Sequence, residues 1–269
     1  MKDAYEILDR GYEEHKPVAT FLLFSGGHDS LTATHLSASW CQERGLPFKV
    51  AHVNTGIGVE ETREFVRDTC RQHEWDLVEL HADREEQTYE YIVRNYGFPA
   101  PGSHSFVYRR LKERKIERLV REAKQDYPRG ARVFLLTGIR REESERRMLH
   151  ADFQRRRRAH VWMAPLEHWS RLDCNDYIAS NGLHRNPVVD LLHMSGECLC
   201  GAFARVDAML ELEHWFPDTG AYIHGLGQQV GARGHVNCLW GLPAQFAFQP
   251  YPEQGLLFSP LCVGCENNR

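Results

Sequence analysis

The sequence has no hydrophobic run long enough to cross a membrane and no apolar leader at its N-terminus. Its longest candidate apolar run, Val18–Phe24, is far shorter than the roughly 20 residues that a membrane helix needs. The N-terminal segment MKDAYEILDR is charged throughout and lacks the apolar stretch of a signal peptide. These absences argue against membrane insertion and secretion, so we expect a cytoplasmic protein with no membrane partner.

The sequence also has no excess of positive charge. The 33 Lys and Arg residues against 37 Asp and Glu residues give a net charge of −4, so the chain as a whole is not a polyanion binder. Arginines are nevertheless concentrated in one stretch. They form either a solvated surface or a contact for a phosphate, a sulfate or a nucleic acid, because a guanidinium can hold an oxyanion through paired hydrogen bonds. This arginine-rich stretch contains Arg140, Arg141, Arg146, Arg147, Arg155, Arg156, Arg157 and Arg158.

Length and composition are those of a globular protein. The 269 residues allow one or two domains, and 42% hydrophobic with 26% charged residues is an ordinary balance. Short apolar runs alternate with patterns of helical spacing. Strands separated by helices need crossover connections, so we expect an α/β fold with a parallel twisted sheet flanked by helices. The expected strands are Val18–Phe24, Phe48–Val53, Trp75–Leu80, Arg132–Thr137 and His160–Ala164, and the expected helices cover residues 30–44, 60–73, 85–96 and 105–124.

The last part of the chain has a different character. Ser170 and Asp173 have the spacing of a capping box and predict one more helix, which runs to about Ser180. From about Leu191 glycine and cysteine become frequent and the alternation of strand and helix fades. We therefore expect an α/β domain over residues 1–190 and a small cysteine-containing C-terminal module over residues 191–269, packed on the first domain.

The segment Ser25-Gly26-Gly27-His28-Asp29-Ser30 lies between an expected strand and an expected helix, which is the arrangement of an anion site. The glycines allow a tight turn and a close approach to a phosphate, while the first amides of the helix point at that phosphate. The two serines add hydroxyl donors, and Asp29 either holds Mg²⁺ or fixes the loop. The Walker pattern and the dinucleotide pattern GxGxxG are both absent.

Eight cysteines in a chain with no sign of secretion favour metal or redox sites over disulfides. Cys198 with Cys200, and Cys262 with Cys265, form two close-spaced pairs. Four thiolates suit a structural zinc ion or an iron–sulfur cluster, and the alternative is that these cysteines are redox-active or simply buried. Cys238, between the pairs, is a further ligand, a sulfur-carrying nucleophile or a core residue. The other three stand alone in helical patterns and are expected to be buried: Cys41, Cys70 and Cys174.

The string SGGHDS resembles the SGGxDS PP-loop of the ATP pyrophosphatase superfamily. Further blocks are similar to those of the phosphoadenosine phosphosulfate (PAPS) reductase-like family, including its cluster-bearing phage and DNA-modification-type members. The resemblance implies a fold like that of the adenine nucleotide alpha hydrolases. The blocks are HVNTGIGVEETREFV (52–66), TGIRREESERR (137–147) and HRNPVVDLLHMSGECLCGAF (184–203).

The resemblance also implies a site for an adenine nucleotide, either ATP with Mg²⁺ or PAPS or its relative adenosine phosphosulfate (APS). It favours a 4Fe-4S cluster over zinc at Cys198, Cys200, Cys262 and Cys265. The expected strand ends bring the nucleotide-binding loops to one edge of a parallel sheet. Within the site, Asp29, Arg140 and Cys238 are the candidates for the chemistry, and Arg146 and Arg147 are either site or surface residues. The implied nucleotide-binding residues are Ser25, Gly26, Gly27, Asp29, Ser30, Thr55, Gly56, Gly138, Arg140 and Arg141.

Three functions compete. The first is adenylation of an acceptor, such as a nucleic acid, with release of pyrophosphate, followed by sulfur delivery from a donor protein such as a cysteine desulfurase. The second is reduction of PAPS or APS to sulfite. The third is a non-catalytic nucleotide-binding subunit. The Glu-Cys-Gly-Leu-His motif of assimilatory reductases and the tandem Cys-Cys of cluster-type reductases are both missing, which counts against the second.

Overall fold

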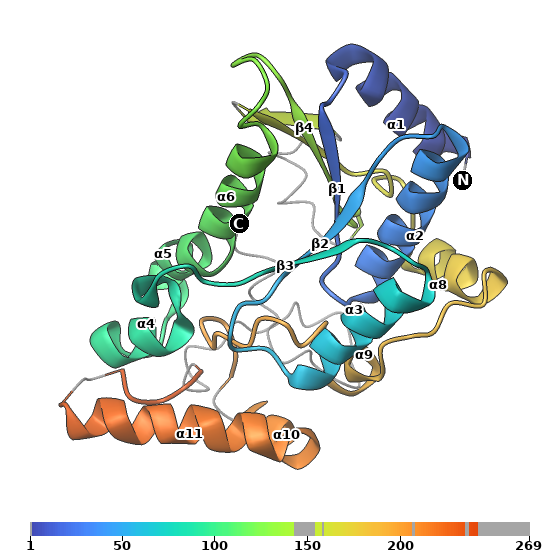
Figure 1. Cartoon of the computed structure of the whole chain (residues 1–269). Helices are drawn as coiled ribbons and strands as arrows, with labels where there is room; N and C mark the ends of the chain where they lie inside the picture. Colours follow the sequence, from blue (N-terminus) through green and yellow to red (C-terminus); the bar gives the residue numbers. More distant parts are fainter. Residues whose placement is uncertain (1, 143–153, 158, 206–207, 235–236, 242–269) are drawn as a thin grey trace. The chain divides into compact units, whose positions relative to one another are not determined.

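The computed structural model describes residues 2–142, 154–157, 159–205, 208–234 and 237–241. The described strands form a sheet with the order β3-β2-β1-β4-β6-β5, of which Figure 1 labels β1 to β4. Neighbouring strands from β3 to β6 run parallel, and β5 pairs with β6 in the antiparallel direction. The bounds are β1 Ala19–Leu23, β2 Lys49–Val53, β3 Leu77–Leu80, β4 Val133–Leu136, β5 Gln154–Arg157 and β6 His160–Met163.

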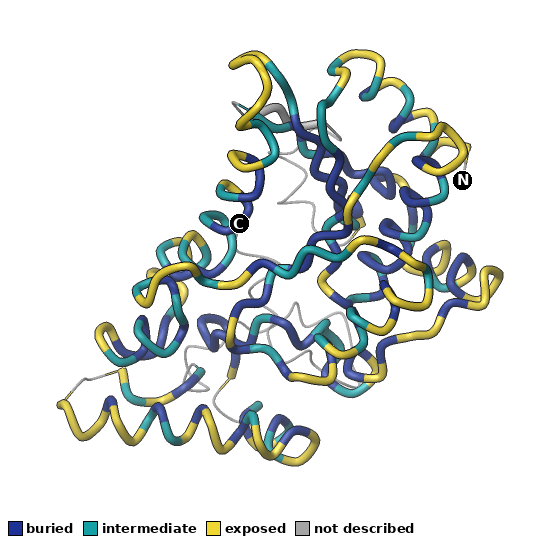
Figure 2. Tube along the Cα trace, viewed as in Figure 1, coloured by how far each residue is buried: buried dark blue, intermediate teal, exposed yellow. Residues whose placement is uncertain are grey.

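Helices pack on both faces of this sheet, as the alternation of the sequence predicts. One face lies against α1, α2, α8 and part of α3, and side chains such as Leu22, Phe134 and Leu136 point into that layer. The other face, with Phe21 and Leu135, lies against α6. The central strands are therefore buried on both sides (Figure 2). These helices are α1 Lys2–His15, α2 His28–Glu43, α3 Glu60–Gln72, α6 Arg114–Ala123 and α8 Arg171–Ser180.

The chain forms two compact units that interleave along the sequence. The first contains Met1–Val53, Glu64–Leu80 and Ile116–Asn186, and the second contains Asn54–Arg63, His81–Lys115 and Pro187–Arg269. The second unit has its own apolar core, which includes Ile57, Tyr89 and Trp240. The domain boundary expected near residue 190 stays a prediction. The helices of the second unit are α4 Tyr89–Tyr96, α5 His104–Tyr108, α9 Pro187–Leu192, α10 Ala208–Trp215 and α11 Pro217–Ala232, together with η1 Glu85–Gln87, η2 Pro101–Ser103 and the π-helix η3 Arg109–Glu113.

Local signals account for several helix boundaries. Ser170 Oγ accepts a hydrogen bond from Asp173 N at 3.1 Å, and Asp173 Oδ2 accepts one from Ser170 N at 2.7 Å, so the predicted capping box is confirmed. The helix predicted over residues 85–96 is divided at Thr88, whose hydroxyl caps α4. In the described part of the chain, no helix combines the length and the apolar character that a membrane span requires.

The three solitary cysteines are buried, as expected. Cys41, Cys70 and Cys174 are each at most 2% exposed. Burial raises the pKa of each thiol to about 12, because the charged thiolate loses its hydration in the core. These thiols are therefore packing groups and not nucleophiles.

We predict that iodoacetamide at pH 8 leaves Cys41, Cys70 and Cys174 unmodified in the folded protein and alkylates them in urea. A pKa of about 12 in place of 9.0 lowers the thiolate fraction by about 1,000-fold. Peptide mass spectrometry after timed quenching measures each site. Modification of these three sites at the same rate in the folded and the unfolded chain would contradict the burial argument.

Candidate functional site

The loop between β1 and α2 is held by its own serines. Ser30 Oγ donates to Gly27 O at 2.8 Å, and Ser25 N donates to Ser30 Oγ at 3.3 Å. Gly26 has a φ of +82°, a conformation that residues with a Cβ rarely adopt. Gly27 is the N-cap of α2 and supplies no side-chain cap to the first turn of the helix. The predicted anion loop therefore has the strand–turn–helix form that such a site requires.

Asp29 lies in the first turn of α2 and is paired with Arg140. Arg140 Nε lies 2.9 Å from Asp29 Oδ2, and Arg140 Nη1 lies 3.0 Å from Glu142 Oε2. Arg140 is 5% exposed although it carries a charge, so the two carboxylates offset the loss of hydration. The thiol of Cys174 also contacts Asp29, whose negative charge adds to the effect of burial on the pKa of that thiol. Asp29 thus joins the loop to Arg140.

The loop that follows β4 lies directly against the anion loop at Gly138. A Cβ on residue 138 would lie 2.6 Å from the carbonyl carbon and oxygen of Asp29 and 2.7 Å from Ser30 N. Real Cβ atoms essentially never make such short contacts. Glycine at position 138 is therefore what permits the two loops to meet. Within the first unit, the Ser25–Ser30 loop and the loop after β4 lie together, as the sequence predicts.

Arg141, next to Arg140, has a different environment. Its amide donates to Glu167 O at 2.9 Å and its Nη2 lies 2.5 Å from Glu167 Oε1. The side chain of Arg141 is 61% exposed, while that of Glu167 is 2% exposed. Glu167 follows β6, so Arg141 ties the loops after β4 and β6 together with its guanidinium near solvent. Of the two neighbouring arginines, Arg140 faces the anion loop and Arg141 faces Glu167.

Two contacts to the anion loop come from the segment after α8. Asn186 is fully buried and donates from Nδ2 to Gly26 O at 2.9 Å. Arg185 Nη2 lies 3.2 Å from Nδ1 of His28, within the loop. In the sequence, Asn186 and Arg185 are visible only as part of the block 184–203 that resembles a family. A single asparagine before a proline gives no signal that it will support a loop so distant in the chain.

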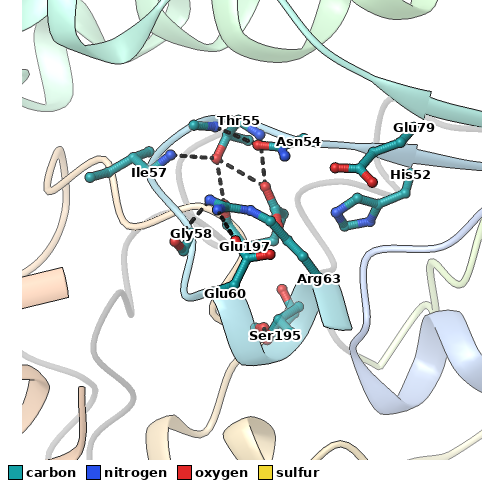
Figure 3. Close-up of polar contacts among 12 residues, drawn as sticks. His52, Asn54, Thr55, Ile57, Gly58, Glu60, Arg63, Glu79, Ser195 and Glu197 are labelled. Carbon is teal, nitrogen blue, oxygen red and sulfur yellow. Dashed lines mark hydrogen bonds and ion pairs between the residues drawn. The ribbon is translucent and has the colours of Figure 1, made fainter. Parts of the chain in front are cut away.

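In the second unit, Thr55 is held by Glu197 (Figure 3). Thr55 N donates to Glu197 Oε1 at 2.7 Å, and Thr55 Oγ1 donates to Glu197 O at 2.5 Å. Gly56 is exposed and has a φ of +78°. In this structure both donors of Thr55 are therefore engaged by Glu197, and its expected contact with a nucleotide stays a prediction.

Lys115 is a buried cation that the sequence analysis did not identify. It is 1% exposed, and its Nζ donates to Asn54 O at 2.5 Å, in the segment that directly follows β2. It lies just after the π-helix Arg109–Glu113, a rare distortion that is often found at functional sites. A lysine in a charged helical pattern is usually solvated, so the sequence contained no signal of its burial.

The cysteines of the second unit border one apolar core. Cys200 is part of that core, and Cys198 and Cys238 pack against it. Trp240 Nε1 donates to Leu199 O at 2.8 Å, so the segment that carries Cys238 lies on the Cys198–Cys200 segment. Cys238 itself packs against Gly227 and Gly231 of α11. Its packing role is visible, and its roles as ligand or nucleophile stay predictions.

Part of the predicted metal and arginine sites lies outside the described residues, namely Cys262, Cys265, Arg146, Arg147 and Arg158. Arg155, Arg156 and Arg157 form most of β5. Among the described residues, no three His, Cys, Asp or Glu side chains gather where they could hold a metal ion. Cys198 and Cys200 are two residues apart in one segment, and their role as metal ligands stays a prediction.

We predict that Gly138→Ala lowers the free energy of unfolding by about 1–3 kcal/mol, because the new methyl group forces the two loops apart. Gly130→Ala is the matched control, since a Cβ at that exposed position meets no atom within 4 Å. Urea unfolding followed by tryptophan fluorescence measures both variants. Equal stability of the two would show that the loops separate without cost.

Comparisons with known proteins agree with the fold and the loops. Sulfate adenylyltransferase subunit 2 of Mycobacterium sp. (strain KMS) is 26% identical over 179 residues, which is 64% of this chain and 57% of the relative. The chain thus matches somewhat more than half of the length of that relative. The counterpart from Mycobacterium sp. (strain MCS) gives the same figures.

Among solved structures, the PAPS reductase of Candida auris, crystallised as a phosphate complex, has a TM-score of 0.52 at 16% identity and covers 70% of this chain and 84% of its own. The FMN adenylyltransferase of Candida glabrata with FMN and an ATP analogue has a TM-score of 0.52 at 14% identity, with 71% and 59% covered. These two likenesses show a shared fold. The phosphoadenosine phosphosulfate reductase domain family matches residues 19–198, more than half of the chain including the anion loop, so this protein belongs to that family.

Proposed function

We propose that this protein is an adenine-nucleotide-dependent enzyme of sulfur chemistry that binds Mg·ATP, adenylates an acceptor and delivers sulfur through its cysteines. One observation carries the proposal, namely the Ser25–Ser30 loop, which is joined through Asp29 to the buried cation of Arg140. Membership of the family supports a nucleotide-binding role related to sulfur metabolism. The likeness to sulfate adenylyltransferase subunit 2 favours adenylyl transfer as the reaction.

The anion loop would bind the phosphates through the first amides of α2, which Gly27 leaves without a side-chain cap. The hydroxyls of Ser25 and Ser30 add donors at the same turn. Mg²⁺ would arrive with the nucleotide and be held mainly by its phosphates. Because Asp29 is paired with Arg140, its proposed role is to fix the loop and keep Arg140 in place. Gly138, Arg140 and Arg141 would complete the phosphate site from the loop after β4.

The proposed reaction begins with adenylation of the acceptor and ends with regeneration of the cysteines. An oxygen of the acceptor attacks the α-phosphorus of ATP, and pyrophosphate leaves with the electrons of the broken P–O bond. A cysteine persulfide then forms a carbon–sulfur bond, and AMP leaves with the acceptor oxygen. A second thiol then attacks the sulfur of the persulfide cysteine, which breaks its bond to the transferred sulfur and forms a disulfide between the two cysteines. A dithiol reductant reduces that disulfide and restores both thiols. Positioning and charge stabilisation would supply the acceleration of the adenylation.

The sulfur step would belong to the second unit, with Cys238 as the sulfur carrier. A persulfide donor such as a cysteine desulfurase would load Cys238. A nucleic acid is the proposed acceptor, because the arginine-rich stretch would contact its phosphates. The soft sulfur ligands Cys198, Cys200, Cys262 and Cys265 would hold a 4Fe-4S cluster or zinc.

Sulfonucleotide reduction is the second candidate, and the name of the matched family favours it. The same loop would then bind PAPS or APS. A thiolate would attack the sulfur and displace the nucleotide phosphate, and a second thiol would close a disulfide with the first as sulfite leaves. The assimilatory Glu-Cys-Gly-Leu-His motif is not present in this sequence. A nucleotide-binding subunit without activity would bind ATP and catalyse neither reaction.

We predict that anaerobically purified protein releases pyrophosphate from Mg·ATP. We also predict that Asp29→Asn lowers the rate by about 100-fold, since Arg140 loses one of its two carboxylate partners, the one in the anion loop. Asp68→Asn is the control, because Asp68 is an exposed residue on α3 that pairs with Arg71 of the same helix. A coupled pyrophosphate assay with and without added RNA or DNA measures the rates.

If the protein forms sulfite from PAPS or APS and releases no pyrophosphate from ATP, sulfonucleotide reduction replaces adenylation as the proposed function. Binding of ATP by equilibrium dialysis without either product would support the non-catalytic subunit. Equal rates for Asp29→Asn and Asp68→Asn would remove Asp29 from the proposed site.

We predict that the anaerobically purified protein contains iron and acid-labile sulfide, or else zinc, and that Cys198→Ser and Cys262→Ser each abolish the bound metal. Thiolates at all four positions are needed because a serine hydroxyl is a poor ligand for soft metals. Cys41→Ala is the control, since its fully buried thiol lies in the core of the first unit. Elemental analysis and the visible spectrum measure the content, and full retention in both serine variants would refute the assignment.

A further inference from the structure

We propose that Glu197 is a positioning residue for Cys198, because it fastens the Cys198–Cys200 segment to the loop Thr55–Gly58. The inference deepens the proposed function and rests on it, since it gives the Cys198 thiol a place in the sulfur chemistry. The contacts that carry it all lie within the second unit. Figure 3 shows how the side chains of Thr55, Arg63 and Glu197 meet.

Glu197 binds Thr55 at two points. Its Oε1 accepts from Thr55 N at 2.7 Å, and its main-chain oxygen accepts from Thr55 Oγ1 at 2.5 Å. Both the side chain and the backbone of Glu197 are thus engaged by one residue. The carboxylate and the main chain of Glu197 are therefore anchored independently, and Cys198 is the next residue in the chain.

The carboxylate of Glu197 is buried and has a cationic partner. Glu197 is 3% exposed, and its Oε2 lies 3.7 Å from Arg63 Nε. Arg63 is held in turn by Glu60 Oε2 at 2.8 Å and by Gly58 O at 2.8 Å. The carboxylate accepts from Thr55 N and Thr55 Oγ1 and lies beside the guanidinium of Arg63. It remains in place because moving away would leave a buried negative charge without these partners.

The two segments also pair along their backbones. Val59 N donates to Gly196 O at 3.0 Å, and Leu199 N donates to Ile57 O at 3.4 Å, on either side of Glu197. A Cβ on residue 58 would lie 2.7 Å from Glu197 O. The close fit leaves no room for the cysteine segment to slide along the loop.

Further donors hold the segment from other elements. Tyr89 of α4 donates from its hydroxyl to Cys200 O at 2.9 Å, and Trp240 Nε1 donates to Leu199 O at 2.8 Å. The carbonyls of Glu197, Leu199 and Cys200 are therefore each bound by a different side chain. None of these three bonds involves a sulfur atom, so they hold the segment through its backbone.

The test is the rate at which iodoacetamide alkylates Cys198 in the full chain, as purified and after chelator treatment, resolved by peptide mass spectrometry. Cys238, a half-buried thiol of the same unit, is the internal reference. We expect Glu197→Ala to raise the Cys198 rate by about tenfold, with the Cys238 rate unchanged, because the segment loses the bonds that the carboxylate accepts from Thr55 N and Oγ1 and keeps only the main-chain bond. Glu197→Gln keeps an oxygen for Thr55 N and should give a smaller increase.

A matched pair at Thr55 keeps the proposal testable even if Glu197→Ala does not fold. Thr55→Val removes only the hydroxyl and should accelerate Cys198, whereas Thr55→Ser keeps the hydroxyl and should match the unmodified protein. If the folded variants Glu197→Ala and Thr55→Val leave the ratio of Cys198 to Cys238 rates unchanged, the proposal is wrong. Pyrophosphate release by the unmodified protein reports on the proposed function separately, so either can fail alone.

Discussion

The absence of a side chain at position 138 is the constraint on which the candidate site depends. Parallel pairing of β1 with β4 brings the loops that follow these strands to the same edge of the sheet. The loops then meet backbone to backbone, at distances that no Cβ would tolerate. Only in that arrangement can Arg140 reach Asp29 from a buried position. Backbone fit therefore permits the two loops to meet, and the Asp29–Arg140 ion pair lies across that contact.

The buried ion pair between Arg140 and Asp29 adds little to the stability of the fold. The reason is that the free energy lost when Arg140 is removed from water offsets most of the attraction between its guanidinium and Asp29. In the proposed function its value would lie in preorganisation, because a charge that is already desolvated and oriented needs no rearrangement when an anion binds. Asn186, which donates to Gly26 O, serves the same end by fixing the turn.

In the second unit, neutral hydrogen-bond donors hold the backbone of the Cys198–Cys200 segment. A segment with two cysteines so close together needs its backbone held in one conformation if the thiols are to have defined positions. Here Thr55, Trp240 and Tyr89 each bind one carbonyl of that segment. The segment therefore has protein partners that do not depend on a ligand, unlike sites in which the metal supplies the folding energy.

The features that depend on neighbours in the chain could be predicted from the sequence: the parallel strands, the Ser25–Ser30 turn, the capping box at Ser170 and the burial of Cys41. Apolar periodicity and turn chemistry are local, so they need no knowledge of the fold. Strand β5 could not be predicted, because QRRR has no apolar pattern and pairs through backbone groups at the edge of β6. The partners of Asp29 and Thr55, the burial of Lys115 and the interleaving of the two units join residues far apart in the chain. Only tertiary packing decides these, because it alone determines which distant polar groups lose water together and must satisfy one another.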